Sequence, residues 1–516
     1  MNHSKGKEIF VLILCLLIGF ALRFHAFDQK SFWLDEIHTF NDSRDDLKGQ
    51  IRFYKENPAF IQAPLFFVLT HLFYPFPRPE RDLRIIPLIA GTISIPFFYL
   101  LSRSFSSRIA LPCTLSLTLM AYHISLSQDG RSYALLMLLG MAGLFFFMKY
   151  LQSGRRGFLI LVAIFFAILF HTSYSSIPFI ILSQMLWLYK PDTQDGKPSL
   201  ASFSILNGLT FLLCLPWILF VGLNYKGETI VNNPFHTEDP GSIWYILYGV
   251  LHDWVPLAPL MIASTVLLIL FPLFSKSKRN AVVLLAVFIF PITGLFLFCK
   301  LLNIMHFVTS RYFINFLPLF FIALYLSLDA IEAGLGRFRK YLRLTLLFII
   351  LFVASNLVIL PLYYRSQKSD FMGLVAYLKD HLQEGDNIFV GTTGYVPGIL
   401  HYFGIRPEHR HHSMLVQRHS EERVEYKKPF VYKNKIFTIY HSKSCCAQYT
   451  ADGNRLWIVV GKWRAKELKE SSPCVLKGYF DGSFLNFNRF PTDASMYLFL
   501  WDPKSPGEKG MDIPLE

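Results

Sequence analysis

The chain has 516 residues, of which 53% are hydrophobic and only 17% are charged, and its mean hydropathy is +0.37. A typical soluble chain carries about a quarter charged residues, so this composition excludes an ordinary soluble enzyme and a disordered or fibrous protein. Repeated apolar runs of about 20 residues predict a polytopic membrane protein. The net charge of +14 indicates Lys and Arg in cytoplasmic loops beside an anionic leaflet, and no nucleic-acid partner is expected.

The apolar runs predict eleven membrane-spanning helices. The first run, Ile9 to Phe27, follows two lysines and offers no small-residue cleavage site, so we expect an uncleaved helix that starts in the cytoplasm. Ten further spans are predicted at 85–101, 109–127, 133–150, 158–174, 177–189, 202–222, 254–274, 281–301, 312–328 and 342–361. The hairpin at 158–189 is the weakest part of this assignment. None of the eleven runs contains Asp or Glu, which argues against an ion-coupled transporter because such proteins usually need an intramembrane carboxylate.

The loops between these runs predict the orientation of the chain. Short loops rich in Lys and Arg alternate with longer loops that hold the acids and histidines, as the positive-inside rule requires. The two largest outer loops are residues 28–84 and 222–253. We expect amphipathic helices in both loops, lying on the membrane around a cavity with a lipid-accessible and an aqueous side. An odd number of spans places the C-terminus outside.

After Arg365 the composition becomes that of a soluble domain. Ser369-Asp370 can cap a helix that starts at Phe371, and further elements are predicted at 387–391 (strand), 395–403 (helix) and 455–461 (strand). These features predict two domains, a membrane domain over 1–365 and a small α/β domain over 366–516. If the second domain faces an oxidising compartment, Cys474 can pair with Cys445 or Cys446.

The segment Ser31-Phe32-Trp33-Leu34-Asp35-Glu36, just beyond the first helix, is the sharpest chemical feature. One interpretation is a solvated acidic pair beside an interfacial Trp. The other is a carboxylate, Asp35, that Trp33 and Phe32 hold at the membrane surface, where it can act as a general base on a hydroxyl or amine. Glu36 would then raise the basicity of Asp35 by like-charge repulsion or bind a divalent metal.

A second cluster, Gln128-Asp129-Gly130-Arg131-Ser132-Tyr133, lies at the outer start of the fourth span. Arg131 at a helix N-terminus can bind a lipid phosphate through its guanidinium group. An arginine that snorkels to the membrane interface is an equally good explanation of this residue on its own.

Two further clusters are expected on the same side of the membrane. One is His171-Thr172-Ser173-Tyr174, although a single histidine near a turn is more often structural than catalytic. The other is the pair Arg311-Tyr312, again at the outer edge of a span. Four weak signals on one side of the membrane favour a site that acts on a lipid headgroup.

Several short motifs occur in a characteristic order. They are the acidic pair 35–36, APLFF at 63–67 with His71, LRIIP at 83–87, QDGRSYAL at 128–135, 170–174, LPW at 215–217, SRYFINFLP at 310–318 and the stretch 371–391. In these motifs the chain resembles bacterial polyprenyl-phosphate-sugar-dependent glycosyltransferases of the GT-C superfold. The pattern is nearest to the protein O-mannosyltransferases, the lipid A aminoarabinose transferases and similar family 39 enzymes. Where relatives often carry Lys, His or an acid before the loop proline, this chain has Gln62-Ala63-Pro64, so the metal stays unknown and a divalent ion remains possible.

The resemblance implies a glycosyltransferase of the inner membrane that moves a hexose or pentose from a polyprenyl phosphate to a lipid, glycan or protein. Its first domain would be the catalytic GT-C domain and its second a periplasmic α/β domain. It implies Asp35 and Glu36 as catalytic residues, Arg131, Arg311, Tyr133 and Tyr312 at the donor phosphate, and Trp33, Asp129, His171 and Tyr174 near the sugar or acceptor. The alternative function is a flippase or transporter of lipids or oligosaccharides.

Overall fold

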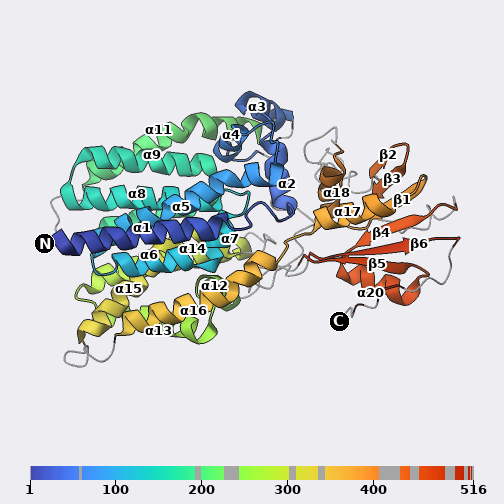
Figure 1. Cartoon of the computed structure of the whole chain (residues 1–516). Helices are drawn as coiled ribbons and strands as arrows, with labels where there is room; N and C mark the ends of the chain where they lie inside the picture. Colours follow the sequence, from blue (N-terminus) through green and yellow to red (C-terminus); the bar gives the residue numbers. More distant parts are fainter. Residues whose placement is uncertain are drawn as a thin grey trace.

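The computed structural model describes residues 2–56, 58, 61–191, 199–225, 243–301, 309–334, 343–405, 430–441, 453–482, 494–504, 510–511 and 513. A helical bundle forms one end of the molecule and a β-sheet with its own helices forms the other (Figure 1). The predicted cysteine pairing and most of the predicted loop 222–253 lie outside the described residues.

The helices of the bundle follow one another along the chain. They are α1 (Asn2–Phe24), α2 (Leu34–Asp42), α3 (Leu47–Glu56), α4 (Leu65–His71), α5 (Pro79–Phe105), α6 (Ala110–Leu119), α7 (Ala121–Ser127), α8 (Tyr133–Ser153), α9 (Arg156–Thr172), η2 (Tyr174–Ser176), α10 (Ile177–Leu182), η3 (Ser183–Leu188), α11 (Leu200–Asn224), α12 (Ile243–Trp254), α13 (Ala258–Phe274), α14 (Lys278–Leu301), η4 (Ser310–Phe316), α15 (Leu317–Gly334) and α16 (Leu344–Arg365). Helices α2, α3 and α4 confirm that the predicted loop 28–84 contains helices.

The chain is a multi-pass helical membrane protein. Six helical segments in its described part are long and apolar enough to cross a membrane, and there are up to eight if two bent helix pairs each count as one span. The bent pairs are α6 with α7, which meet at 62°, and α12 with α13, which meet at 106°. The other three predicted spans fall on α1, the short helix α9, and α10 with η3. All eleven apolar runs are therefore helical, whereas length and composition support six to eight crossings.

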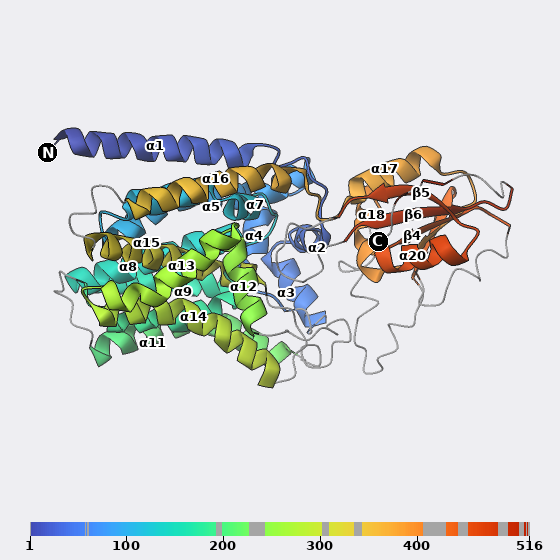
Figure 2. The ribbon, with the colours of Figure 1, turned by 90° about the horizontal axis from the view of Figure 1, so that it is seen from below.

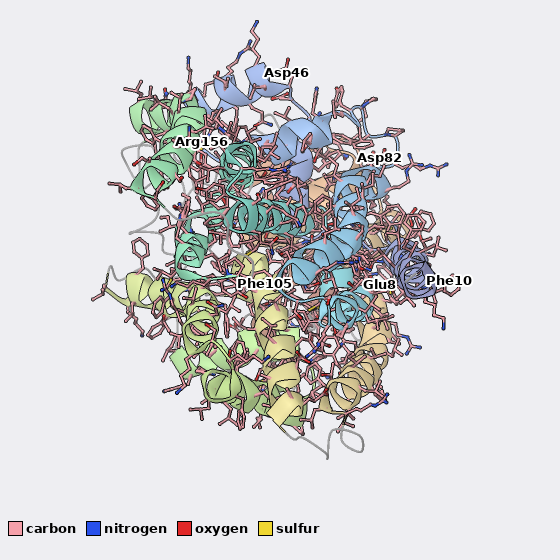
Figure 3. The ribbon with its side chains drawn as sticks, turned by 90° about the vertical axis from the view of Figure 1, so that its left-hand side faces the viewer. Glu8, Phe10, Asp46, Asp82, Phe105 and Arg156 are labelled. Atoms are coloured by element: carbon pink, nitrogen blue, oxygen red, sulfur yellow. The ribbon has the colours of Figure 1, made fainter. Side chains whose placement is uncertain are left out.

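The basic ends of several helices gather at the end of the bundle that carries the N-terminus. Figure 3 looks along the bundle from this end, where Glu8, Phe105 and Arg156 are labelled. Arg103 in α5 pairs with Glu8 at 3.5 Å, and Arg108 pairs with Asp329 at 3.4 Å. The sheet lies at the opposite end (Figure 1).

The break between α6 and α7 is stabilised by two other helices. Arg23 of α1 donates to the carbonyl oxygens of Leu117 and Thr118, at the C-terminal end of α6, at 3.0 and 3.2 Å. The side-chain oxygen of Asn356 in α16 accepts from the first backbone N–H of α7, at Ala121, at 2.9 Å. These bonds satisfy backbone groups that would otherwise be unpaired in an apolar environment. The bend is therefore stabilised by contacts with α1 and α16.

The C-terminal part contains a six-stranded mixed sheet. Its elements are α17 (Phe371–His381), β1 (Asp386–Val390), η6 (Thr393–Tyr395), α18 (Val396–Phe403), β2 (Phe430–Lys433), β3 (Phe437–His441), β4 (Leu456–Val460), α20 (Lys462–Ser471), β5 (Val475–Phe480) and β6 (Met496–Trp501). The strand order is β2-β3-β1-β4-β6-β5. Strand β1 pairs in parallel with β3 and β4, and the other neighbours are antiparallel. The predicted elements at 371–382, 387–391, 395–403 and 455–461 are confirmed.

The two faces of this sheet pack against different helices. Successive residues of a strand point to opposite faces; Ile388 and Val390 of β1 therefore pack with α17 and α18, whereas Phe389 packs with Ala465 of α20. Figure 2 shows α17 and α20 on either side of the strands. The sheet thus forms the middle of three layers. Helix α18, on the same face as α17, also contacts α2 of the membrane domain.

Helix α17 begins at the predicted cap. The Asp370 carboxylate accepts a hydrogen bond from the backbone N–H of Gly373 at 2.9 Å. Replacing Asp370 with Ala removes the acceptor, and we expect a loss of about 1 kcal/mol in the free energy of unfolding, measured by thermal unfolding in detergent. The control Asp380→Ala changes an exposed acid of the same helix and should cost less than about 0.5 kcal/mol; equal losses in both variants would contradict the cap.

Candidate active site

The two adjacent acids of the first loop lie in different environments. Both stand in the first turn of α2, and adjacent residues of a helix point about 100° apart. The Asp35 side chain is 29% exposed and its Oδ2 lies 3.6 Å from Nη1 of Arg311. Glu36 is only 2% exposed. The pair is therefore not a solvated acidic patch, and one carboxylate of the two remains accessible.

Glu36 is held by Arg84 of α5. Arg84 Nε donates to Glu36 Oε1 at 2.7 Å and Nη2 donates to Oε2 at 2.8 Å. The Glu36 carboxylate also accepts from the backbone N–H of Gly130 at 2.7 Å and of Trp33 at 3.3 Å. This differs from the expectation that Glu36 raises the basicity of Asp35 or binds a metal, because Arg84 neutralises its charge and four hydrogen bonds occupy its oxygens.

Arg311, at the start of η4, reaches Asp35 across a group of aromatic rings. Its guanidinium carbon lies 5.3 Å from the ring centre of Trp33, 5.8 Å from that of Tyr133 and 5.7 Å from that of Tyr312. Its buried Nε has no hydrogen-bond partner among the described residues. The structure thus brings five predicted site residues together. It leaves the Nε–H of Arg311 without an acceptor among the described residues.

Arg131 approaches the same helix from the loop before α8. Its Nη1 donates to the backbone carbonyl of Asp35 at 3.2 Å and to Oγ1 of Thr39 at 2.8 Å. Within the described part of the chain, its buried Nε also lacks a hydrogen-bond partner. Arg131 is therefore an integral contact of α2 and not an arginine that extends to the interface.

Asp129 anchors the Trp33 ring. Its carboxylate accepts from Trp33 Nε1 at 2.9 Å and from Lys368 Nζ at 2.6 Å. Burial of Asp129 disfavours its charged form, but the Lys368 ammonium and the two hydrogen bonds outweigh this effect and hold the pKa of Asp129 below its usual value. Lys368 also lies 4.3 Å from the Trp33 ring centre. Together with Arg311, Asp129 and Lys368 fix Trp33 from three distant segments of the chain.

His171 and Tyr174 lie in a different cluster. Trp217 Nε1 of α11 donates to the Tyr174 hydroxyl at 2.8 Å, and His171 Nε2 lies 3.3 Å from the carbonyl oxygen of Leu213. Tyr174 packs with Tyr54 and Trp217. The structure therefore does not bring these two predicted residues into contact with Asp35 or the arginines.

Three residues that position this site were not predicted from the sequence. Arg84 stands out in the sequence only as part of the motif at 83–87, and Lys368 lies in the connection after α16. Asp253 of α12 accepts a hydrogen bond from Ser310, the residue before Arg311, and Ser310 is also 2.8 Å from the Tyr122 hydroxyl. A sequence signal existed for Asp253 alone, as an acid at the end of an amphipathic segment beside Trp254.

The helix that carries Asp35 is also part of the core of the C-terminal sheet. Phe32 and Ile37 pack in one cluster with residues of α17 and α18, such as Ile399. The Tyr402 hydroxyl of α18 accepts from the Phe32 backbone N–H at 2.7 Å and donates to Glu80 at 2.9 Å. The C-terminal part therefore helps to set the position of α2.

A metal site would need clustered ligands. Across the described residues, no group of three or more His, Cys, Asp and Glu side chains is arranged to hold a metal ion. The segment Gln62-Ala63-Pro64 contains no charged side chain. The site described above relies on arginines for its positive charge.

No protein-family model and no curated protein sequence matches the chain. Solved structures match it over nearly its whole length. ArnT from Cupriavidus metallidurans bound to undecaprenyl phosphate has 11% identity and a TM-score of 0.53, with 99% of this chain and 100% of that chain covered. ArnT from the same organism in the apo state gives 11% identity, coverage of 96% and 98%, and a TM-score of 0.55.

An oligosaccharyltransferase from Archaeoglobus fulgidus, tethered to an acceptor peptide, is also similar, with 12% identity and a TM-score of 0.50. The match covers 96% of this chain and 74% of the oligosaccharyltransferase. At these identities the similarity is one of fold. The chain thus has a fold similar to that of ArnT and of this oligosaccharyltransferase, which agrees with the resemblance seen in its motifs.

Proposed function

We propose that this protein is a membrane glycosyltransferase that moves a sugar from a polyprenyl-phosphate donor to an acceptor. The observation that carries the proposal is the group formed by Asp35, Arg311 and Arg131. A partly exposed carboxylate stands 3.6 Å from one arginine, and a second arginine holds its backbone carbonyl. The GT-C fold supports the same conclusion, because one structure with this fold, that of ArnT, contains undecaprenyl phosphate.

The arginines suit the phosphate of such a donor. Each guanidinium group keeps one buried N–H without a partner in the described part of the chain, and phosphate oxygens are strong acceptors for arginine donors. The surrounding rings of Trp33, Tyr133 and Tyr312 limit access of water to Arg311, which strengthens electrostatic stabilisation of a leaving phosphate. In this proposal, Tyr133 and Tyr312 contact the same phosphate group.

The reaction then follows as a single displacement with inversion at the anomeric carbon. Asp35 removes the proton from the acceptor hydroxyl or amine as that atom attacks. The bond between the anomeric carbon and the phosphate oxygen breaks, and the electron pair leaves with the lipid phosphate. Arg131 and Arg311 stabilise its charge, while Glu36 and Asp129 position α2 and Trp33.

We further propose the topology that this chemistry requires. The membrane domain covers residues 1–365 and crosses the inner membrane eleven times, with the N-terminus in the cytoplasm. Residues 366–516 form a periplasmic α/β domain beside the site. The acceptor is a lipid, a glycan or a protein of the cell envelope.

The experiment that tests the donor class gives the full chain in detergent synthetic polyprenyl-phosphate sugars together with a cell-envelope extract that supplies lipid, glycan and protein acceptors. It measures release of free polyprenyl phosphate. We expect wild-type protein to release it, and Arg311→Gln to release it about 10²- to 10³-fold more slowly, because one preorganised positive group at the leaving phosphate is lost. Arg155→Gln is the matched control, since Arg155 is exposed and directly precedes Arg156, which lies at the opposite end of the bundle (Figure 3).

Equal rates for wild type, Arg311→Gln and Arg155→Gln would show that Arg311 does not act on the phosphate. No release by folded wild-type protein from any donor would contradict the transferase and favour a flippase. In that case the lipid should remain bound and unmodified.

A further inference from the structure

A small cavity lies beside Trp33, and neither Arg131 nor Arg311 is among the residues that line it. Its volume is about 60 Å³, and its lining includes Lys30, Trp33, Arg84, Asp129 and Lys368. These residues come from the connection after α1, from α5, from the loop before α8 and from the connection after α16. The C-terminal ends of α1 and α16 lie at the same end of the bundle as α2 (Figure 2). The cavity therefore lies beside the C-terminal ends of these two apolar helices, at the end of the bundle that carries Asp35.

The charged side chains around the cavity differ in how many of their hydrogen-bond donors and charges have partners. Arg84 uses all five N–H donors, on Glu36 and on the carbonyl oxygens of Phe27, Lys30 and Ser31. Lys368 pairs with Asp129. Glu36 and Asp129 are thus both neutralised. Three cations face two carboxylates, and the cavity keeps a net positive charge.

Lys30 is the unbalanced cation. Its ammonium group donates to the backbone carbonyl of Tyr363, and in the described part of the chain no carboxylate lies within 4.0 Å of it. An ammonium has three N–H donors, so Lys30 and Lys368 each hold two that these contacts do not use. Lys30 is half-buried, and withdrawing its ammonium from water without a counter-charge costs free energy. An anion that enters the cavity offsets this cost.

We propose that this cavity binds a tetrahedral oxyanion, either the phosphate of a lipid headgroup or a free phosphate or sulfate ion, between Lys30 and Lys368. A volume of about 60 Å³ exceeds severalfold the 10–15 Å³ that one water molecule needs, so a small polyatomic ion fits. Arg131 and Arg311 are not among the lining residues, so this site is separate from the donor phosphate and does not rest on the proposed reaction. Trp33 belongs to both sites.

The electrostatics of Lys30 give the site a pH dependence. Burial, helped by the charges of Lys368 and Arg84 and opposed by Glu36 and Asp129, lowers the pKa of Lys30 to about 7. An anion binds the protonated form, so the pKa of Lys30 rises on binding and a proton is taken up. Because the charged fraction falls about tenfold between pH 6 and pH 8, the apparent affinity should fall by about the same factor.

Sulfate is the probe, because its own charge does not change in this pH range. Isothermal titration of the full chain in detergent should show binding that weakens about tenfold from pH 6 to pH 8, with proton uptake seen as a buffer-dependent heat. Lys30→Met should lose at least about tenfold in affinity at pH 6. Lys30→Arg should keep the affinity but lose the pH dependence, because an arginine stays charged throughout.

Lys55→Met, at an exposed lysine of α3, is the matched control and should bind sulfate as wild type does. Native mass spectrometry of protein taken from phosphatidylglycerol nanodiscs then distinguishes the source. A lipid retained by wild type and lost in Lys30→Met identifies a headgroup phosphate, whereas sulfate binding without a retained lipid identifies a free ion. Absence of sulfate binding by folded wild-type protein, or binding unchanged in Lys30→Met, would overturn the proposal.

Discussion

Asp35→Asn is expected to lower the rate of polyprenyl phosphate release by about 10²- to 10⁴-fold, because general base catalysis of the acceptor's attack is lost. Asparagine has the same shape as aspartate and its amide oxygen can still accept from Arg311, but it cannot take a proton at neutral pH. Within the described residues the Asp35 side chain forms an ion pair with Arg311 alone, and it is 29% exposed, so the fold should tolerate the change. The measurement is the initial rate of polyprenyl phosphate release with a synthetic donor and a cell-envelope extract as the source of acceptors.

Asp28→Asn is the control for this experiment. Asp28 lies in the same loop and is exposed, so the variant should retain wild-type activity. A donor-binding measurement on Asp35→Asn separates loss of the base from loss of binding, and we expect donor binding to persist. If Asp35→Asn releases polyprenyl phosphate as fast as wild type, Asp35 is not the base.

Arg84→Met is expected to destabilise the protein by about 3–5 kcal/mol, the usual loss when one partner of a buried ion pair is removed. Glu36 would remain buried with only the backbone N–H groups of Gly130 and Trp33. The carbonyl oxygens of Phe27, Lys30 and Ser31 would also lose their common donor. The measurement is denaturant or thermal unfolding of the full chain in detergent.

The double variant Glu36→Gln/Arg84→Met should recover part of this loss, because the unpaired charge disappears. Arg103→Met is the control, since Arg103 and Glu8 form an exposed pair of the kind that contributes about 0–1 kcal/mol. A loss in Arg84→Met no larger than in Arg103→Met would show that the Glu36–Arg84 pair does not hold the loop.

The elements of the membrane domain could be predicted because their signal is local. Each of the eleven apolar runs is helical, since a backbone surrounded by lipid must satisfy its own hydrogen bonds. The bends were not predicted. The break at Met120 depends on Arg23 and Asn356 from other helices, which supply the missing hydrogen bonds, and nothing in residues 109–127 alone reveals them.

The C-terminal sheet shows the same difference between local and distant information. The parallel strand β1 and its neighbour β4 are short apolar runs and were predicted from composition. Strands β2, β3, β5 and β6 were not, and two of them (β2 and β5) lie at the sheet edges. Their stability comes from cross-strand neighbours, which one segment of sequence does not contain.

The apolar runs and the change of composition after Arg365 are enough to predict a multi-helix membrane protein with a polar C-terminal part, and the local motifs indicate Asp35, Arg131 and Arg311 as candidate site residues. That Asp35 is accessible and its neighbour Glu36 is buried follows from the folded structure alone. That difference comes from partners far along the chain, because Arg311 approaches Asp35 whereas Arg84 and Gly130 enclose Glu36. Hydrophobic periodicity is a property of neighbouring residues and can be recognised in the sequence. The pairing of charges depends on how distant segments pack.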